Sequence, residues 1–144
     1  MSNEFSCFFY GSLVSPEVIR RVLSDNGNEK ITVDLNSGAP AVLKGYKRHK
    51  VRGAWYPAII KSKDDETKGV VFKGLTYNDL LKLDYYEGDQ YKRVNVEVFV
   101  NNSTDPIPTQ TYVWIASNDL LENEDWSFDE FKKQMQESNI NLFE

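Results

Sequence analysis

The sequence places one carboxylate where acid–base chemistry is expected. Glu87 precedes Gly88 at the end of a predicted helix, in the motif Leu-Asp-Tyr-Tyr-Glu-Gly at residues 83–88. The negative end of a helix dipole and apolar burial both disfavour a charged carboxylate, so both raise its pKa. Such a group suits a general acid or base near neutral pH. Lys92 or Arg93 would lower that pKa, and a solvated glutamate at a helix end is the alternative interpretation.

A second candidate is the turn Tyr10-Gly11-Ser12-Leu13, which lies between a predicted buried strand and a predicted helix. Gly11 lets the backbone turn sharply, which leaves neighbouring amides without partners in a strand ladder. Free amides beside a helix N-terminus bind carboxylate or phosphate groups. The turn is therefore a candidate anion site, and an ordinary strand-to-helix connection is the alternative.

The aromatic pair Trp55-Tyr56 precedes Pro57 at the start of a predicted strand. Because cis peptide bonds occur almost only before proline, the Tyr56–Pro57 bond is a candidate for the cis form. Core packing is the simpler explanation of the two aromatic side chains.

Cysteine and histidine contribute one residue each, Cys7 and His49, which restricts the available chemistry. One cysteine forms no internal disulfide, and the two residues together cannot supply a zinc site. Cys7 lies in an aromatic strand and is expected to be a small core residue. The spacing gives no support to a Cys7–His49 nucleophile pair.

Several short elements must position these residues. A strand at residues 5–10 precedes a helix that starts at Ser15-Pro16-Glu17 and ends at 25–28. Residues 31–73 are β-rich, with strands at 41–43, 57–60 and 70–72 and a polar, hairpin-like link at 61–68. A helix capped by Thr76 and Asp79 is expected to be largely buried through its leucines and Tyr85. Strands at 94–100 and 111–115 and a helix from Ser127 complete an α+β domain over residues 1–144.

Composition and charge exclude some classes of partner. The 144 residues carry 17 Lys and Arg against 22 Asp and Glu, a net charge of −5. An acidic balance argues against nucleic-acid binding, although the run KGYKRHKVR at 44–52 concentrates basic residues. We expect that run to be the wet face of a strand. No apolar stretch approaches the roughly 20 residues that span a bilayer, and the start, Met-Ser-Asn-Glu, lacks the basic region and apolar stretch expected of a signal peptide. A cytoplasmic protein without nucleic-acid or membrane partners is expected.

The order of the motifs resembles the γ-glutamylcyclotransferase-like superfamily, and most closely its avirulence-induced-gene-like branch. The resemblance runs from about Phe8 to Trp114. The motifs that carry it are Tyr10-Gly11-Ser12-Leu13, Gly45-Tyr46, Tyr56-Pro57-Ala58-Ile59, Gly69-Val70-Val71, Leu83 to Gly88 and Tyr91-Lys92-Arg93. It implies a small mixed β-barrel with about three flanking helices and a cavity between them.

The resemblance also implies a site and a reaction. Glu87 is the general acid/base, and the 10–13 turn binds the α-carboxylate of a γ-glutamyl substrate through its amides. Tyr56, Tyr91 and Tyr112 are expected to face the substrate, with Arg93 in support. The α-amine would attack the γ-carbonyl and release 5-oxoproline and an amine, without metal or cofactor.

Three questions stay open after the resemblance. The donor is a γ-glutamyl amino acid, γ-glutamyl-ε-lysine or another γ-glutamylamine, with glutathione less expected. A non-catalytic module of the same fold, binding a small ligand or a protein, is the alternative to an enzyme. The sequence does not indicate the oligomeric state.

Overall fold

The computed structural model describes residues 5–23 and 38–138. In these ranges the strands are β1 (Phe5–Phe9), β2 (Ala39–Lys50), β3 (Pro57–Leu75), β4 (Tyr91–Val100) and β5 (Ile107–Trp114). The α-helices are α1 (Pro16–Leu23), α2 (Tyr77–Glu87) and α3 (Phe128–Ser138), with short 3₁₀ helices η1 (Ser12–Val14) and η2 (Asn118–Leu120). The predicted α+β class is confirmed. The predicted end of the first helix at 25–28 lies outside the described residues.

The five strands form one curled antiparallel sheet in the order β1-β3-β2-β4-β5. Its two edge strands approach each other through side chains: Ser6 Oγ lies 2.7 Å from Thr109 Oγ1, and Thr111 Oγ1 donates to the Phe8 carbonyl at 2.9 Å. Within the described ranges no backbone ladder joins β1 to β5. The predicted mixed barrel is therefore not confirmed, because hydroxyl groups occupy the seam where ladder bonds would close it.

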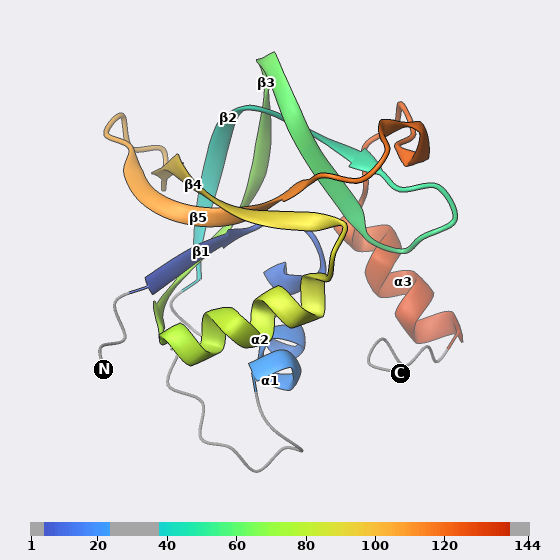
Figure 1. Ribbon diagram of the computed structural model, residues 1–144, viewed down its shortest axis with the longest axis horizontal. Helices are drawn as coiled ribbons and strands as arrows, with labels where there is room; N and C mark the ends of the chain where they lie inside the picture. Colours follow the sequence, from blue (N-terminus) through green and yellow to red (C-terminus); the bar gives the residue numbers. More distant parts are fainter. Residues whose placement is uncertain (1–4, 24–37, 139–144) are drawn as a thin grey trace.

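The polar stretch 61–68 is not the predicted hairpin link but part of β3, which runs without interruption over 19 residues. β2 pairs with β3 on both sides of residues 62–65, which have no partner in β2, and the register shifts between Lys44 and Tyr46. Gly45, at φ +87°, faces the extra residues of β3 in this irregularity. A bulge of this kind bends both strands, and Figure 1 shows the corner near the label β3. Residues 62–65 lie in this irregularity, outside the ladder, and residues 63–65 are exposed to solvent.

The helix α2 begins and ends as its sequence predicts. Thr76 Oγ1 accepts from the Asp79 amide at 3.0 Å, and Asp79 Oδ2 accepts from the Thr76 amide at 2.9 Å. This capping box satisfies two amides that the first turn leaves unpaired. Gly88 ends the helix at φ 82°, and its amide donates to the Asp84 carbonyl at 3.0 Å. These signals fix the position of Glu87 at the last helical residue.

The expectation that α2 is apolar on more than one side and largely buried is wrong on one face. Leu80 and Leu83 are buried, but Leu81 is 45% exposed and Tyr85 is 91% exposed. The helix lies beside α1 against one face of the sheet, as Figure 1 shows, so only the side turned to them is covered. An apolar residue at the outer positions is therefore compatible with a surface helix.

Three buried clusters hold the fold together. The first joins β1, α1 and α2, with Cys7, Phe9, Ile19 and Leu83 among its members. The second fills the inside of the curled sheet around Phe8. The third lies towards η2, on the other side of the sheet's corner.

In the described ranges no helix is long and apolar enough to cross a bilayer.

Candidate active site

A cavity of about 650 Å³, counting the open space at its mouth, lies where β1 meets α2. Its walls come from four parts of the chain: the end of β1 with the following turn, the segment before β3, the end of α2 with the next residues, and β5. The lining residues are Phe8, Phe9, Tyr10, Gly11, Ser12, Leu13, Trp55, Tyr56, Pro57, Tyr86, Glu87, Gln90, Tyr91 and Tyr112.

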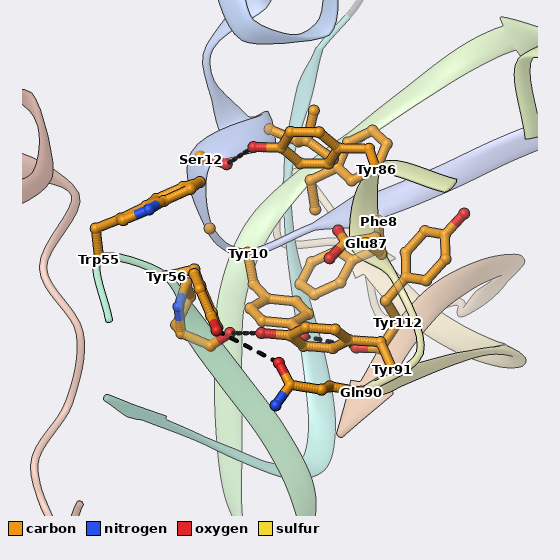
Figure 2. A pocket seen from close by; sticks show the side chains of 14 residues that line it. Phe8, Tyr10, Ser12, Trp55, Tyr56, Tyr86, Glu87, Gln90, Tyr91 and Tyr112 are labelled. Atoms are coloured by element: carbon orange, nitrogen blue, oxygen red, sulfur yellow. Dashed lines mark hydrogen bonds between the residues drawn. The ribbon is translucent and has the colours of Figure 1, made fainter. Parts of the chain in front are cut away.

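The Glu87 carboxylate points from the end of α2 into this cavity, among aromatic side chains (Figure 2). Burial, reinforced by the negative charge of Asp84, raises its pKa to about 8. Its side chain keeps partial exposure at the cavity, while the surrounding protein shields it from bulk water. None of the described residues donates a hydrogen bond to it. Glu87 is therefore a poorly solvated carboxyl group that faces open space.

The predicted supporting cation, Arg93, contacts Asp84 instead of Glu87. Arg93 Nε lies 3.4 Å from Asp84 Oδ1, and the same oxygen accepts from the Tyr112 hydroxyl at 2.6 Å. Arg93 Nη1 is buried and has no hydrogen-bond partner among the described residues. Because Arg93 forms an ion pair with Asp84, it does not lower the pKa of Glu87. The sequence left open whether burial or a neighbouring cation would dominate the pKa of Glu87, and in the structure burial dominates.

The hydroxyls of three predicted substrate-binding tyrosines donate to protein acceptors. Tyr10 donates to the Tyr112 carbonyl and Tyr91 to the Pro57 carbonyl, both at 2.6 Å, while Tyr112 donates to Asp84. Burial raises the pKa of all three phenols, so they stay protonated. The tyrosines therefore connect the walls of the cavity and present their rings to it.

The turn after β1 forms the side of the cavity next to α2. Gly11 lies so close to Pro57 that an added Cβ would be 2.9 Å from the proline ring. Ser12 and Leu13 are buried at the start of η1, and Ser12 Oγ lies 3.0 Å from the Tyr86 hydroxyl. The first amides of a helix have no intrahelical acceptor, and this turn lines the same cavity as Glu87.

Trp55 and Tyr56 line the opposite side, with ring centroids 5.3 Å apart and planes at 90°. The Tyr56–Pro57 bond is trans, so the cis candidate is wrong. Sequence reasoning assigned Trp55 to core packing, and it gave no role to Tyr86 or Gln90, which also line the cavity. Tyr86 lies inside the glutamate motif, a signal that was available, whereas Gln90 carries no sequence signal.

The remaining candidates lie elsewhere. Cys7 is fully buried, and burial raises the pKa of its thiol to about 12. His49 lies on β2 with Nδ1 2.9 Å from the Glu122 carbonyl oxygen, and no described contact joins it to Cys7. In the basic run, Arg48 pairs with Asp125 and Lys50 with Glu124, at 2.7 and 3.4 Å. In the ranges 5–23 and 38–138, acidic, Cys and His side chains form no cluster suited to a metal ion.

Comparison with known families identifies the fold. A family model described as "Gamma-glutamyl cyclotransferase, AIG2-like" matches residues 7–128. The chain belongs to this family. The match includes every residue of the cavity, from Phe8 to Tyr112. The resemblance found in the motifs is therefore confirmed.

Relatives from Arabidopsis thaliana match over most of their length. AIG2-like protein B is 34% identical over 136 residues, which are 94% of this chain and 74% of the relative. AIG2-like protein D is 36% identical over 129 residues, which are 89% of this chain and 79% of the relative. The chain thus shares nearly its whole length with members of the AIG2-like family.

Solved structures show the same architecture. A solution structure of an Arabidopsis thaliana protein is 31% identical and superposes with a TM-score of 0.70, covering 99% of this chain and 82% of the other. A structure titled "Gamma-glutamyl cyclotransferase" is 22% identical with a TM-score of 0.63, covering 97% and 83%. The second likeness shows a shared fold.

Proposed function

We propose that the protein is a γ-glutamyl cyclotransferase that releases 5-oxoproline and an amine from a γ-glutamyl donor. The observation that carries the proposal is the Glu87 carboxyl group, which is shielded, has a raised pKa and faces a cavity bordered by the 10–13 turn. Membership of the AIG2-like family supports the reaction class.

The turn and the rings would fold the donor for an intramolecular attack. Amides at Gly11, Ser12 and Leu13 bind the substrate α-carboxylate in this proposal, because unpaired amides beside a short helix attract anions. The α-nitrogen then lies near the γ-carbonyl carbon, and holding two groups of one molecule in reach already removes much of the barrier. The protein has mainly to orient the donor and to move protons.

Glu87 would carry the proton. The α-nitrogen loses a proton to Glu87 and forms a C–N bond to the γ-carbonyl carbon, closing the five-membered ring. The amide bond to the leaving nitrogen then breaks as that nitrogen takes a proton from Glu87. The α-nitrogen gives its second proton to solvent, and the released amine takes one from solvent, so the protons balance. A carboxyl group with a pKa of about 8 is a stronger base than an ordinary glutamate. It is therefore better matched to a substrate ammonium.

A donor panel tests the proposal. Purified protein is incubated with γ-glutamyl amino acids, γ-glutamyl-ε-lysine and γ-glutamyl alkylamides, and 5-oxoproline is quantified by chromatography. We expect at least one donor to react, and Glu87→Gln to lower kcat by about 10² to 10⁴, the usual worth of a general acid–base group. Asp89→Asn, an exposed acidic residue two positions further on, is the matched control and should retain activity.

Two results would count against the proposal. Undiminished turnover by Glu87→Gln would remove Glu87 as the acid–base group. Ligand binding by folded wild-type protein, without 5-oxoproline from any donor, would instead favour a non-catalytic module of the same fold.

A further inference from the structure

The side of the cavity formed by Trp55 and Tyr56 is aromatic and carries no charge. Of the described residues that line the cavity, Glu87 is the one with an ionised form near neutral pH, and Gln90 supplies a neutral amide. The glutamyl end of a donor, under the proposed function, occupies the turn and Glu87. Its leaving group then extends away from Glu87, and Figure 2 shows Trp55 and Tyr56 across the cavity from Glu87.

Packing holds this wall in place. The Trp55 ring lies 5.8 Å from that of Phe131 on α3, and the Trp55 carbonyl accepts from Trp126 Nε1 at 2.8 Å. The Tyr56 ring lies 6.4 Å from that of Tyr91. Its hydroxyl donates to Gln90 Oε1 at 3.3 Å, which leaves the ring turned to the cavity. A wall supported on both sides loses little conformational freedom when a ligand packs on it.

Arg48, a cation that contacts the cavity wall from outside, is already committed to protein acceptors. Arg48 Nη1 donates to the Tyr10 carbonyl at 2.8 Å, and Arg48 Nε and Nη2 donate to the Asp125 carboxylate at 2.7 and 3.3 Å. Arg48 does not line the cavity. A carboxylate on the leaving group would therefore be desolvated without a cation and would lie in the same cavity as Glu87, whose charge repels it.

A leaving amine without a carboxylate is instead stabilised by this wall. Its apolar body is buried against ring faces, and a flat body gains edge-to-face contacts as well. When the nitrogen leaves and is protonated, the new cation is attracted by aromatic rings and by Glu87. The wall therefore favours a neutral, flat leaving group at the start of the reaction and a cation at its end.

We propose that Trp55 and Tyr56 form a leaving-group subsite that selects γ-glutamyl amides of arylalkyl amines over γ-glutamyl amino acids. This inference rests on the proposed function. It narrows the donor class and names the residues that set it.

Three matched donors test the subsite. γ-Glutamylphenethylamide and γ-glutamylphenylalanine differ by one carboxylate, and γ-glutamylethylamide lacks the ring. We expect kcat/KM for the phenethylamide to exceed that for each of the other two at least tenfold. The affinities of Glu87→Gln for the same donors, measured by calorimetry, give a second readout that needs no turnover, and the phenethylamide is expected to bind most tightly there too.

Variants of Trp55 test the contribution of its ring separately from that of the rest of the cavity. Trp55→Ala should lower the preference for the phenethylamide over the ethylamide at least fivefold, and Trp55→Leu, which retains apolar bulk, should lower it as well. Near-ultraviolet circular dichroism establishes that both variants fold. Tyr85→Ala removes a 91% exposed ring outside the cavity and should leave the preference unchanged.

Several outcomes would overturn the subsite. Equal or tighter binding of γ-glutamylphenylalanine to Glu87→Gln would show that the wall accepts a carboxylate. An unchanged donor preference in both folded Trp55 variants would remove Trp55 from the subsite. Absence of 5-oxoproline from every donor would overturn the proposed function, while the calorimetric comparison would still decide whether the wall selects uncharged arylalkyl groups.

Discussion

Glu87 should make the folded protein less stable as the pH rises. Below about pH 4.5, the ordinary value for a glutamate, the carboxyl group is protonated in both folded and unfolded chains and has no effect. Above it the unfolded chain ionises, while the folded protein retains the proton up to about pH 8. The free energy of unfolding therefore falls across this interval and levels off above it.

The size of the effect follows from the interval. At about 1.4 kcal/mol per pH unit, the rise from 4.5 to about 8 amounts to about 5 kcal/mol. This is an upper bound, because the side chain keeps partial exposure at the cavity and water there solvates part of its charge. Glu87→Gln has nearly the same shape and cannot ionise. Its stability relative to the wild type should therefore increase with pH, while its activity is lost.

Urea denaturation followed by tryptophan fluorescence measures this difference. Both proteins are unfolded at intervals from pH 4.5 to pH 9, and the two free energies of unfolding are subtracted at each pH. Glu97→Gln, which removes an exposed acidic residue on β4, shows how much one surface charge contributes in a protein of net charge −5. A difference between Glu87→Gln and the wild type that stays constant with pH would refute the reasoning, because it would mean that Glu87 titrates alike in both states.

Three further predictions concern the surroundings of Glu87 and the core. In the wild-type protein, kcat/KM should rise with pH as Glu87 loses its proton. Asp84→Asn should move this rise to lower pH, because a neighbouring negative charge is removed. A rise at the same pH in Asp84→Asn and wild type would contradict that coupling. Gly69→Ala should lower the free energy of unfolding by about 2–3 kcal/mol or more in urea titrations, since its Cβ would clash with the Phe9 carbonyl oxygen. Cys7→Ser should keep kcat/KM within about threefold, because the buried thiol, with a pKa of about 12, supplies no thiolate; a larger loss would reopen a nucleophilic role.

Local signals made some elements predictable. Thr76 and Asp79 form a capping box and Gly88 a helix end within a few residues of the chain, so α2 and the place of Glu87 follow from sequence alone. The exposure of Tyr85 does not, because burial of a helix face depends on what packs against it. Whether β1 and β5 close a barrel likewise depends on the distance between two edges that no local pattern encodes.

The features of the site likewise divide into those that local sequence predicts and those that depend on tertiary structure. That a helix end and burial raise the pKa of Glu87 was predictable from the chain, but their balance against Lys92 and Arg93 was not. The family resemblance was carried by short motifs. The pairing of Arg93 with Asp84 required the relative position of β4 and α2. Trp55 became part of the cavity because α3, more than 70 positions along the chain, supports its ring through Phe131. Charge partners and cavity walls of this kind depend on tertiary structure.

The bond from the Tyr10 hydroxyl to the Tyr112 carbonyl spans 102 positions of the chain. Contacts of such long range form slowly, because the loop between them must be closed before they can stabilise anything. During synthesis, the turn at 10–13 and the end of α2 lack the part of the cavity wall that Tyr112 supplies until β5 has been made. The cavity around Glu87 is therefore expected to be assembled late in folding, and a nascent chain that stops before Tyr112 would expose an unfinished aromatic surface to the cell.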